Sequence, residues 1–148
     1  GVRKDYDYAF EEEKYRGAPD IRLHEIDVAR PLEIAGERIV PVSGHHSERF
    51  EVTGYRIGRM AYLTDFKTIA DAEVGKLIGV ELLVVNALRF RPHPSHFNVE
   101  EALALIARVA PRRALITHVS HEIGRHAATT ALLPRGVELA YDGLEIII

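Results

Sequence analysis

Four short apolar runs in this 148-residue sequence each lead into histidine or aspartate, and this arrangement limits the folds that the chain can adopt. Short runs rich in β-branched residues are typical of strands buried in a parallel sheet. The carboxyl ends of such strands meet at one edge of an open α/β sheet, where ligands bind. The four runs, each given with the polar residues after it, are 39–42 with His45 and His46, 60–64 with Asp65, 82–86 with His93 and His96, and 114–117 with His118 and His121.

The first third of the sequence has the pattern of a β meander, and the later strands alternate with helices. Alternating or continuously apolar segments predict the strands. Ala35-Gly36 and Gly58 predict turns inside the meander, and Asp142-Gly143 predicts a hairpin near the end of the chain. The expected strands cover residues 21–26, 32–34, 37–42, 50–57, 60–63, 82–85, 115–119, 137–140 and 144–148.

Three helices are expected between the later strands. The strongest begins after Asn98, whose side chain can cap the first turn, and ends at Pro111. Apolar residues at helical spacing predict two shorter helices over 68–77 and 123–132. The meander and the alternating elements together indicate a layered α/β fold, and the length suits a single domain over residues 1–148.

Composition argues against several classes of protein. The net charge is −3 and the isoelectric point is near 6.3, so the chain lacks the basic footprint of a nucleic-acid-binding protein. Cysteine is absent, which excludes disulfides and thiolate zinc sites. No apolar run approaches the roughly 20 residues that a membrane span needs, and no signal peptide is recognisable. These features predict a soluble, cytoplasmic protein with neither a membrane nor a nucleic acid as its partner.

Each candidate site residue has a structural interpretation beside the functional one. Asp65 can cap the helix that is expected to follow it, and His118 can bind backbone groups at the end of a strand. His45 and His46 can form a solvated pair in a loop, and His96 can simply precede a helix. Imidazole and carboxylate groups are also ligands of zinc, manganese and iron. The residues alone leave both interpretations open.

The order and spacing of these segments resemble those of the metallo-β-lactamase-fold hydrolases. The sequence is similar to the branch that contains the cyclic phosphodiesterases of the carbon–phosphorus lyase pathway, and the tRNA 3′-processing nucleases look like more distant relatives. The resemblance implies an αββα sandwich, in which helices flank two packed sheets. The segments that carry the resemblance are 39–46, 54–65, 86–97, 115–121 and 140–144.

The resemblance also implies roles for four side chains. His46, Asp65 and His118 match metal ligands of the family, and Asp65 matches the aspartate that bridges two divalent cations, zinc or manganese. His96 matches the residue that donates a proton to the leaving group. The activity implied is hydrolysis of a small phosphodiester, for example a cyclic one, by a hydroxide that two metal ions activate. The alternatives are a thioester or lactone hydrolase of the same fold, and a non-catalytic domain that has lost the first metal site.

Two further histidines are expected behind the metal ligands. His121 would fix the tautomer or the orientation of His118, and His45 lies beside the ligand loop. Both positions follow from the resemblance and from the spacing to the matching ligands.

The sequence departs from the family by lacking its His-x-His-x-Asp-His motif. That motif supplies most ligands of the first metal, and the strands that normally precede it are absent from the sequence as well. The chain therefore resembles the C-terminal part of a larger domain. Two metal ions are expected in the complete protein, whereas this chain alone is expected to bind metal weakly or not at all, so the activity of the chain alone stays open. We expect the chain to self-associate or to pair with an N-terminal portion that completes the fold.

Overall fold

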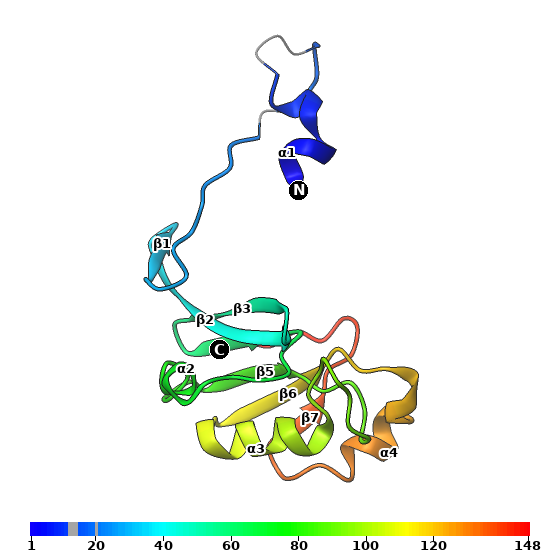
Figure 1. Cartoon of the computed structure of the whole chain (residues 1–148). Coiled ribbons are helices and arrows are strands. Elements are labelled where there is room, and N and C mark those ends of the chain that lie inside the picture. The colour runs from blue at the N-terminus through cyan, green and yellow to red at the C-terminus, as the bar shows by residue number, and fades with distance from the viewer. Residues whose placement is uncertain (12–14, 20) are drawn as a thin grey trace.

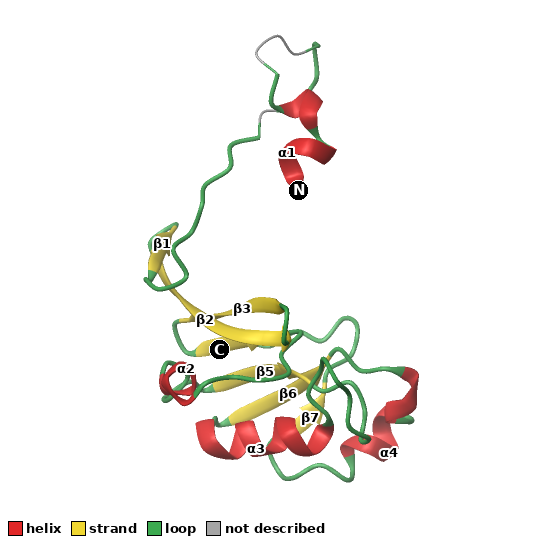
Figure 2. Ribbon diagram, viewed as in Figure 1, coloured by secondary structure: helices red, strands yellow, loops and turns green. Residues whose placement is uncertain are grey.

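Strands follow one another across a single sheet in the same order as along the chain (Figures 1 and 2). The structure, a computed structural model, describes residues 1–11, 15–19 and 21–148. Within these residues the sheet has seven strands, antiparallel from the first to the fourth and parallel from the fourth to the seventh. The strands are β1 (Leu32–Ile34), β2 (Glu37–Ser47), β3 (Phe50–Ile57), β4 (Met60–Leu63), β5 (Leu82–Asn86), β6 (Arg113–Thr117) and β7 (Val137–Leu139).

Helices cover one face of this sheet. The main core lies between α2, α3 and the side chains that β4, β5 and β6 direct to that face, such as Leu63, Val85 and Ile116. The helices are α1 (Val2–Asp5), α2 (Asp71–Gly75), α3 (Val99–Val109) and α4 (His126–Thr130), and short 3₁₀ turns cover Asp7–Ala9 and His121–Ile123. None of the helices in the described part of the chain is both long and apolar enough to cross a membrane.

The longest helix, α3, begins and ends where the sequence predicts. Asn98 accepts a hydrogen bond from the Glu101 backbone, and the Glu101 carboxylate accepts one from the Asn98 backbone, which forms a complete capping box. Ala110 closes the helix in the left-handed conformation, directly before Pro111. This firm start matters because the loop that carries His96 leads straight into Asn98.

β5 is the most completely buried strand, with all five residues inside. Leu83 and Val85 belong to the main core under the helices, whereas Leu82 and Val84 face the other side of the sheet. There Leu82 and Val84 form a small second core with the C-terminal segment, including Leu144. A strand covered on both faces has no need of alternation, which explains its continuous apolar pattern.

Two strand predictions were wrong. Residues 21–26 alternate in polarity but form no strand, because this exposed segment leads from the N-terminal turns to β1 without a neighbouring strand to pair with (Figure 1). Residues 144–148 also form no strand. The turn at Asp142-Gly143 does form, and the Leu144 N–H donates to the Tyr141 carbonyl at 3.1 Å. The segment after this turn packs across the sheet face instead of adding to its edge.

Several predicted elements have different bounds. The predicted helices over 68–77 and 123–132 contain α2 and α4, which are only five residues long each. The strand predicted over 115–119 begins and ends two residues earlier, because His118 takes a left-handed backbone and leaves the sheet. The meander strands and the hairpin at Ala35-Gly36 are confirmed, and β2 extends further than expected, to Ser47.

Candidate metal centre

The directions of the strands bring the candidate residues to one edge of the sheet. β2 and β4 are both antiparallel to β3, so they run in the same direction, and β5 and β6 run parallel to β4. Leu63, Val85 and Ile116 lie side by side near the carboxyl ends of β4, β5 and β6. The residues that follow these strands therefore emerge level with one another, as expected for a ligand site in an open α/β sheet.

Four of the predicted site residues meet at this edge. The ring centroids of His46 and His96 are 4.5 Å apart, and those of His96 and His118 are 4.8 Å apart. Asp65 lies against them, with its Oδ1 atom 3.3 Å from His118 Nε2 and 3.7 Å from His96 Nδ1. Potential ligand atoms of His46, Asp65 and His96 all lie within 4.8 Å of one another.

Backbone strain accompanies two of these side chains. Asp65 and His118 have φ angles of 63° and 58°, in the left-handed region that residues other than glycine rarely adopt. Each follows a strand of the parallel part closely, so the reversed backbone turns the side chain out of the strand direction. Such strain costs on the order of 1–3 kcal/mol and is concentrated at functional sites.

Asn86, which the sequence analysis treated only as the end of a strand, fixes the position of Asp65. Its fully buried amide accepts a hydrogen bond from the Phe66 N–H at 2.8 Å and donates one to the Phe66 carbonyl at 2.9 Å. An amide at the end of an otherwise apolar strand was the available sequence sign of this role. Because Phe66 is adjacent to Asp65, the two bonds hold the strained turn in place.

The orientation of His46 leaves one ring nitrogen free. Its Nδ1 atom lies 3.1 Å from the Asp65 carbonyl oxygen, which can only accept a hydrogen bond, so Nδ1 is the donor. In a neutral imidazole the other nitrogen, Nε2, then carries the lone pair that a metal ligand needs.

The side chain of His96 is 12% exposed, against 39% for both Asp65 and His118. Among the described residues its Nδ1 atom has no hydrogen-bond partner, since Asp65 Oδ1 at 3.7 Å is too distant for one. Burial lowers the pKa of His96, and the neighbouring His118 and His46 lower it further, against the opposing effect of Asp65. The ring is therefore neutral at neutral pH, with a buried polar atom that lacks a partner.

Cationic groups surround this edge. His93, a residue without an assigned role in the sequence analysis, tilts against His96 with ring centroids 5.1 Å apart. Burial lowers the pKa of His93, and the charges of Arg89 and Lys67 lower it further. Lys67 is held by Glu101, with 2.6 Å between Nζ and Oε1. Each of these two cations has a carboxylate partner, since Arg89 pairs with Glu122, so positive and negative charges alternate behind the imidazoles.

A hollow of about 440 Å³ opens beside the histidines. Its wall comes from the same elements that carry the site: the end of β2, the loop after Asp65 and the loop before His96. Main-chain hydrogen bonds join His45 to the segment that follows Asp65. The lining residues are His45, Ser47, Glu48, Lys67, Thr68 and Pro94.

His45 and His121, which were expected behind the metal ligands, lie apart from the four side chains that meet at this edge. The side chain of His45 is exposed and belongs to the hollow. His121 is exposed in a 3₁₀ turn, and the described contacts include no hydrogen bond between it and His118. The orienting role of each therefore stays a prediction.

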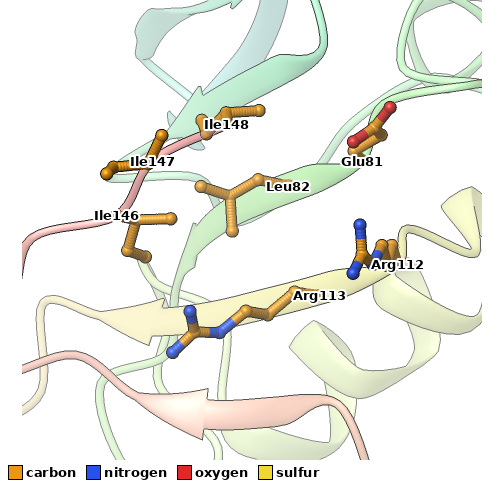
Figure 3. A pocket seen from close by; sticks show the side chains of 7 residues that line it. All are labelled: Glu81, Leu82, Arg112, Arg113, Ile146, Ile147 and Ile148. Atoms are coloured by element: carbon orange, nitrogen blue, oxygen red, sulfur yellow. The ribbon is translucent and has the colours of Figure 1, made fainter.

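A second hollow, of about 180 Å³, lies at the opposite edge of the sheet (Figure 3). It forms where β5 and β6 begin, and Figure 3 shows the C-terminal isoleucines facing Leu82 with Glu81 and Arg112 on the other side. Its residues are Glu81, Leu82, Arg112, Arg113, Ile146, Ile147 and Ile148, so it is separate from the histidine edge.

Comparison with known proteins identifies the family. Residues 1–119 match the family described as the beta-lactamase superfamily domain. A protein of Porphyromonas gingivalis (strain ATCC BAA-308 / W83) named octanoyltransferase is 36% identical over 148 residues, which cover 99% of this chain and 30% of that protein. The chain thus spans less than a third of that relative.

Solved structures share the arrangement of the chain. A crystal structure of a new diphosphatase from the PhnP family superposes with a TM-score of 0.87 at 32% identity, over 99% of this chain and 54% of that one. YhfI, a metallo-beta-lactamase fold protein from Bacillus subtilis, gives 0.68 at 15% identity, over 95% and 59%. The short form of human tRNase Z gives 0.58 at 17% identity, over 76% and 44%. At such identities the last two show the fold alone.

Proposed function

The chain belongs to the beta-lactamase superfamily and has the metallo-β-lactamase hydrolase fold, and from this premise we propose that it forms one wall of a metal-dependent phosphodiesterase site. The observation that supports the proposal most is the meeting of four side chains: His46, Asp65 and His118 from the ends of β2, β4 and β6, and His96 from the loop between β5 and α3. The substrate that we propose is a small phosphodiester.

The four side chains fit a divalent metal. Imidazole nitrogens with a carboxylate suit zinc and manganese. The unpartnered Nδ1 of His96 and the free Nε2 of His46 both have lone pairs available, within reach of the same carboxylate. A bound divalent cation supplies charge that polarises a phosphoryl oxygen and makes a water nucleophile available near neutral pH.

In this proposal each residue has a distinct task. Asp65 is the central carboxylate, because it lies against both His96 and His118. His46 and His118 complete the ligand set on either side of it. His96, whose lowered pKa leaves the ring neutral, donates a ring N–H hydrogen bond that steadies charge on the departing oxygen.

The number of ligands bears on how many ions the chain holds. A catalytic zinc ion normally has three protein ligands, whereas His46, Asp65 and His118 would have to be divided between the two ions that the family resemblance implies. Each ion then needs ligands beyond these three. We therefore propose that this chain alone binds metal weakly and that two ions are held in a more complete protein.

The surroundings favour a small anion over a nucleic acid. Lys67 lines a hollow of about 440 Å³ beside this edge, and that volume lies within the range of small-molecule sites. The whole chain carries a net charge of −3, without the broad basic surface that long nucleic acids need.

Hydrolysis of bis(4-nitrophenyl) phosphate tests the proposal. The protein is stripped with EDTA and assayed with and without Mn²⁺ or Zn²⁺, and Asp65→Asn is compared with Asp71→Asn, which alters an exposed aspartate in α2. We expect metal-dependent release of nitrophenol that Asp65→Asn reduces at least about a hundredfold and Asp71→Asn leaves unchanged. Equal activity in the two variants would contradict the assignment of the site.

Thioester hydrolysis is the second candidate, and one comparison favours it. A relative that is 36% identical to the chain is named octanoyltransferase, so an octanoyl thioester is a reasonable second substrate. The same protein samples are given octanoyl-coenzyme A, and thiol release is measured. Metal-dependent thioester cleavage without phosphodiester cleavage would replace the phosphodiesterase proposal by this one.

A further inference from the structure

A charged cluster behind the histidines joins the two loops that carry His96 and His118. Arg89 lies at the start of the loop that leads from β5 to His96, and Glu122 lies in the 3₁₀ turn after His118. Arg89 Nη1 donates to both carboxylate oxygens of Glu122, at 3.0 and 3.1 Å. Its Nη2 donates to the Pro92 carbonyl at 3.1 Å. One guanidinium thus closes its own loop and connects it to the neighbouring one.

The backbone fixes the base of the His96 loop, and Arg89 acts nearer its tip. The Leu88 N–H donates to the Phe97 carbonyl, and the Val99 N–H donates to the Arg89 carbonyl, at 2.9 and 3.0 Å. Pro92, by contrast, lies next to His93 near the middle of the loop. The hydrogen bond from the Arg89 side chain to the Pro92 carbonyl therefore holds the middle of the loop, which the two main-chain hydrogen bonds at the base do not hold.

The Arg89–Glu122 pair is shielded enough to constrain geometry. The two side chains are 25% and 31% exposed. Arg89 Nε is buried and has no hydrogen-bond partner among the described residues, so loss of Glu122 would leave the guanidinium with Pro92 alone. A hydrogen bond from Arg91 and the charge of Arg89 lower the pKa of Glu122, against the effect of its burial. Breaking one side of a partly buried pair is costly because the other charge stays behind.

We propose that Glu122 is a positioning residue that, through Arg89, holds the His93–His96 loop so that His96 faces Asp65. This proposal rests on the proposed function for its catalytic consequence, and on the contacts of the two loops for its structural one. Glu122 acts only through Arg89, so we assign it no contact with substrate or metal. Arg91, which is 79% exposed, donates a further hydrogen bond to the same carboxylate at 3.1 Å.

A double-mutant cycle on Arg89 and Glu122 tests the proposal. The variants Glu122→Gln, Arg89→Gln and their combination are assayed with bis(4-nitrophenyl) phosphate. Misplacement of a reacting group by about 1 Å can cost a hundredfold, so we expect kcat to fall roughly ten- to a hundredfold with KM changed less than about twofold. Because the two residues act as one unit, the double variant is expected to be no slower than the worse single variant.

Glu138→Gln is the matched control. Glu138 pairs with Arg113 across β6 and β7, also through two hydrogen bonds, but at the amino end of β6 and at a higher exposure of 45% and 37%. Its loss is expected to leave kcat unchanged. Glu122→Asp, which keeps the charge, is expected to recover part of the lost kcat. Equal losses in Glu122→Gln and Glu138→Gln, or additive losses in the cycle, would overturn the proposal.

A readout without activity separates this proposal from the proposed function. Hydrogen exchange of the Phe97 and Ser120 amides, which bond to Phe66 and Leu88, reports on the two loops in metal-free protein. We expect exchange at both amides to accelerate in Glu122→Gln and not in Glu138→Gln. If the amides exchange as expected but no sample is active, only the phosphodiesterase proposal is contradicted. Unchanged exchange would sink the positioning role, whatever the activity.

Discussion

The buried side chain of Asn86 fixes the position of Asp65 through the backbone of Phe66, the residue that follows Asp65. Its amide satisfies both backbone groups of Phe66, and Phe66 follows the strained Asp65 directly. Leaving a buried donor or acceptor unpaired costs about 1–3 kcal/mol. The amide therefore stabilises the fold and the placement of Asp65 at the same time.

We predict that Asn86→Ala lowers both stability and metal affinity. The free energy of unfolding should fall by about 1–3 kcal/mol, because the Phe66 N–H loses its acceptor. Val109→Ala, which truncates a buried side chain at the far end of α3, is the control and should cost about 0.5–3 kcal/mol with Mn²⁺ affinity unchanged. Urea unfolding and Mn²⁺ titration measure the two effects. Equal Mn²⁺ affinity in Asn86→Ala and wild type would show that Asn86 does not place Asp65.

The histidines predict a dependence of stability on pH in metal-free protein. The pKa of folded His96 is lowered, chiefly by burial, whereas in the unfolded chain it has its ordinary value of about 6.5. As the pH falls through that value, the unfolded chain takes up a proton that the folded protein excludes, so unfolding becomes easier. The stability of the folded protein is therefore highest above the pKa of the unfolded chain and falls as the pH drops below it. The pKa of His93 is lowered as well, so His93 acts in the same direction.

Chemical unfolding of EDTA-treated protein between pH 8 and pH 5 checks this dependence. His96→Gln should flatten the loss of stability on acidification, because the pKa of His96 is lowered in the folded protein. A slope in His96→Gln as steep as in wild type would show that His96 is not protonated on unfolding in this range.

At the scale of elements, the strands that lead into the site residues were predicted correctly from the sequence, whereas the strands expected near the two ends of the chain were not. Short apolar runs identify β2, β4, β5 and β6, and the rule for carboxyl ends predicts where the polar residues after them meet. Residues 21–26 have the alternating pattern of a strand but no neighbouring strand to pair with. Whether a neighbouring strand is present depends on the tertiary fold, so the local sequence does not predict it. Residues 144–148 are apolar enough for a strand but pack on the sheet face instead.

The supporting contacts of the site were harder to predict than its principal residues. The partners of Asn86, Arg89 and Lys67 lie between 20 and 34 positions away along the chain, so no local pattern pairs them. Backbone strain at Asp65 and His118 is likewise set by tertiary contacts. The spacing of residues indicates which groups reach the edge, whereas the fold determines how they are held.

Close packing between β2 and the Asp65 loop gives an element-scale prediction. A Cβ atom at Gly44 would collide with the Phe66 ring and lie 2.8 Å from the Thr68 carbonyl. Gly44→Ala should therefore lower the free energy of unfolding by about 1–3 kcal/mol. It should also lower the affinity for Mn²⁺, because the added methyl group displaces Phe66. Gly75→Ala, at an open position in α2, should be neutral or stabilising by up to about 1 kcal/mol. Thermal unfolding compares them, and equal stability would argue against this packing.

At the scale of the whole molecule, helices cover only one face of the sheet. The other face bears an apolar hollow of about 270 Å³, lined by Ile26, Leu32, Ile34, Ile39, Tyr55 and Ile57. Ile34 and Tyr62 are 54% and 42% exposed. An αββα sandwich places a second sheet on this side, and the similar diphosphatase chain is nearly twice as long as the part that this chain covers. Uncovered apolar sheet is a site of association.

We predict that this face makes the 148-residue chain self-associate, or pair with an N-terminal portion that restores the sandwich. Sedimentation velocity at rising concentration measures the association, and Ile34→Lys should reduce it by placing a charge on the face. Leu132→Lys, an exposed leucine outside this face, is the control. A monodisperse monomer at high concentration that melts cooperatively would show that the sheet needs no cover.

Histidine imidazole NMR during a Mn²⁺ titration tests most directly whether the four residues form one metal centre. The paramagnetic ion broadens nearby signals even when binding is weak. We predict that His46, His96 and His118 broaden first, that His24 and His126 stay sharp, and that Asp65→Asn abolishes the selectivity. Equal broadening of all these histidines, or selective broadening that survives in Asp65→Asn, would contradict a metal centre at this edge of the sheet.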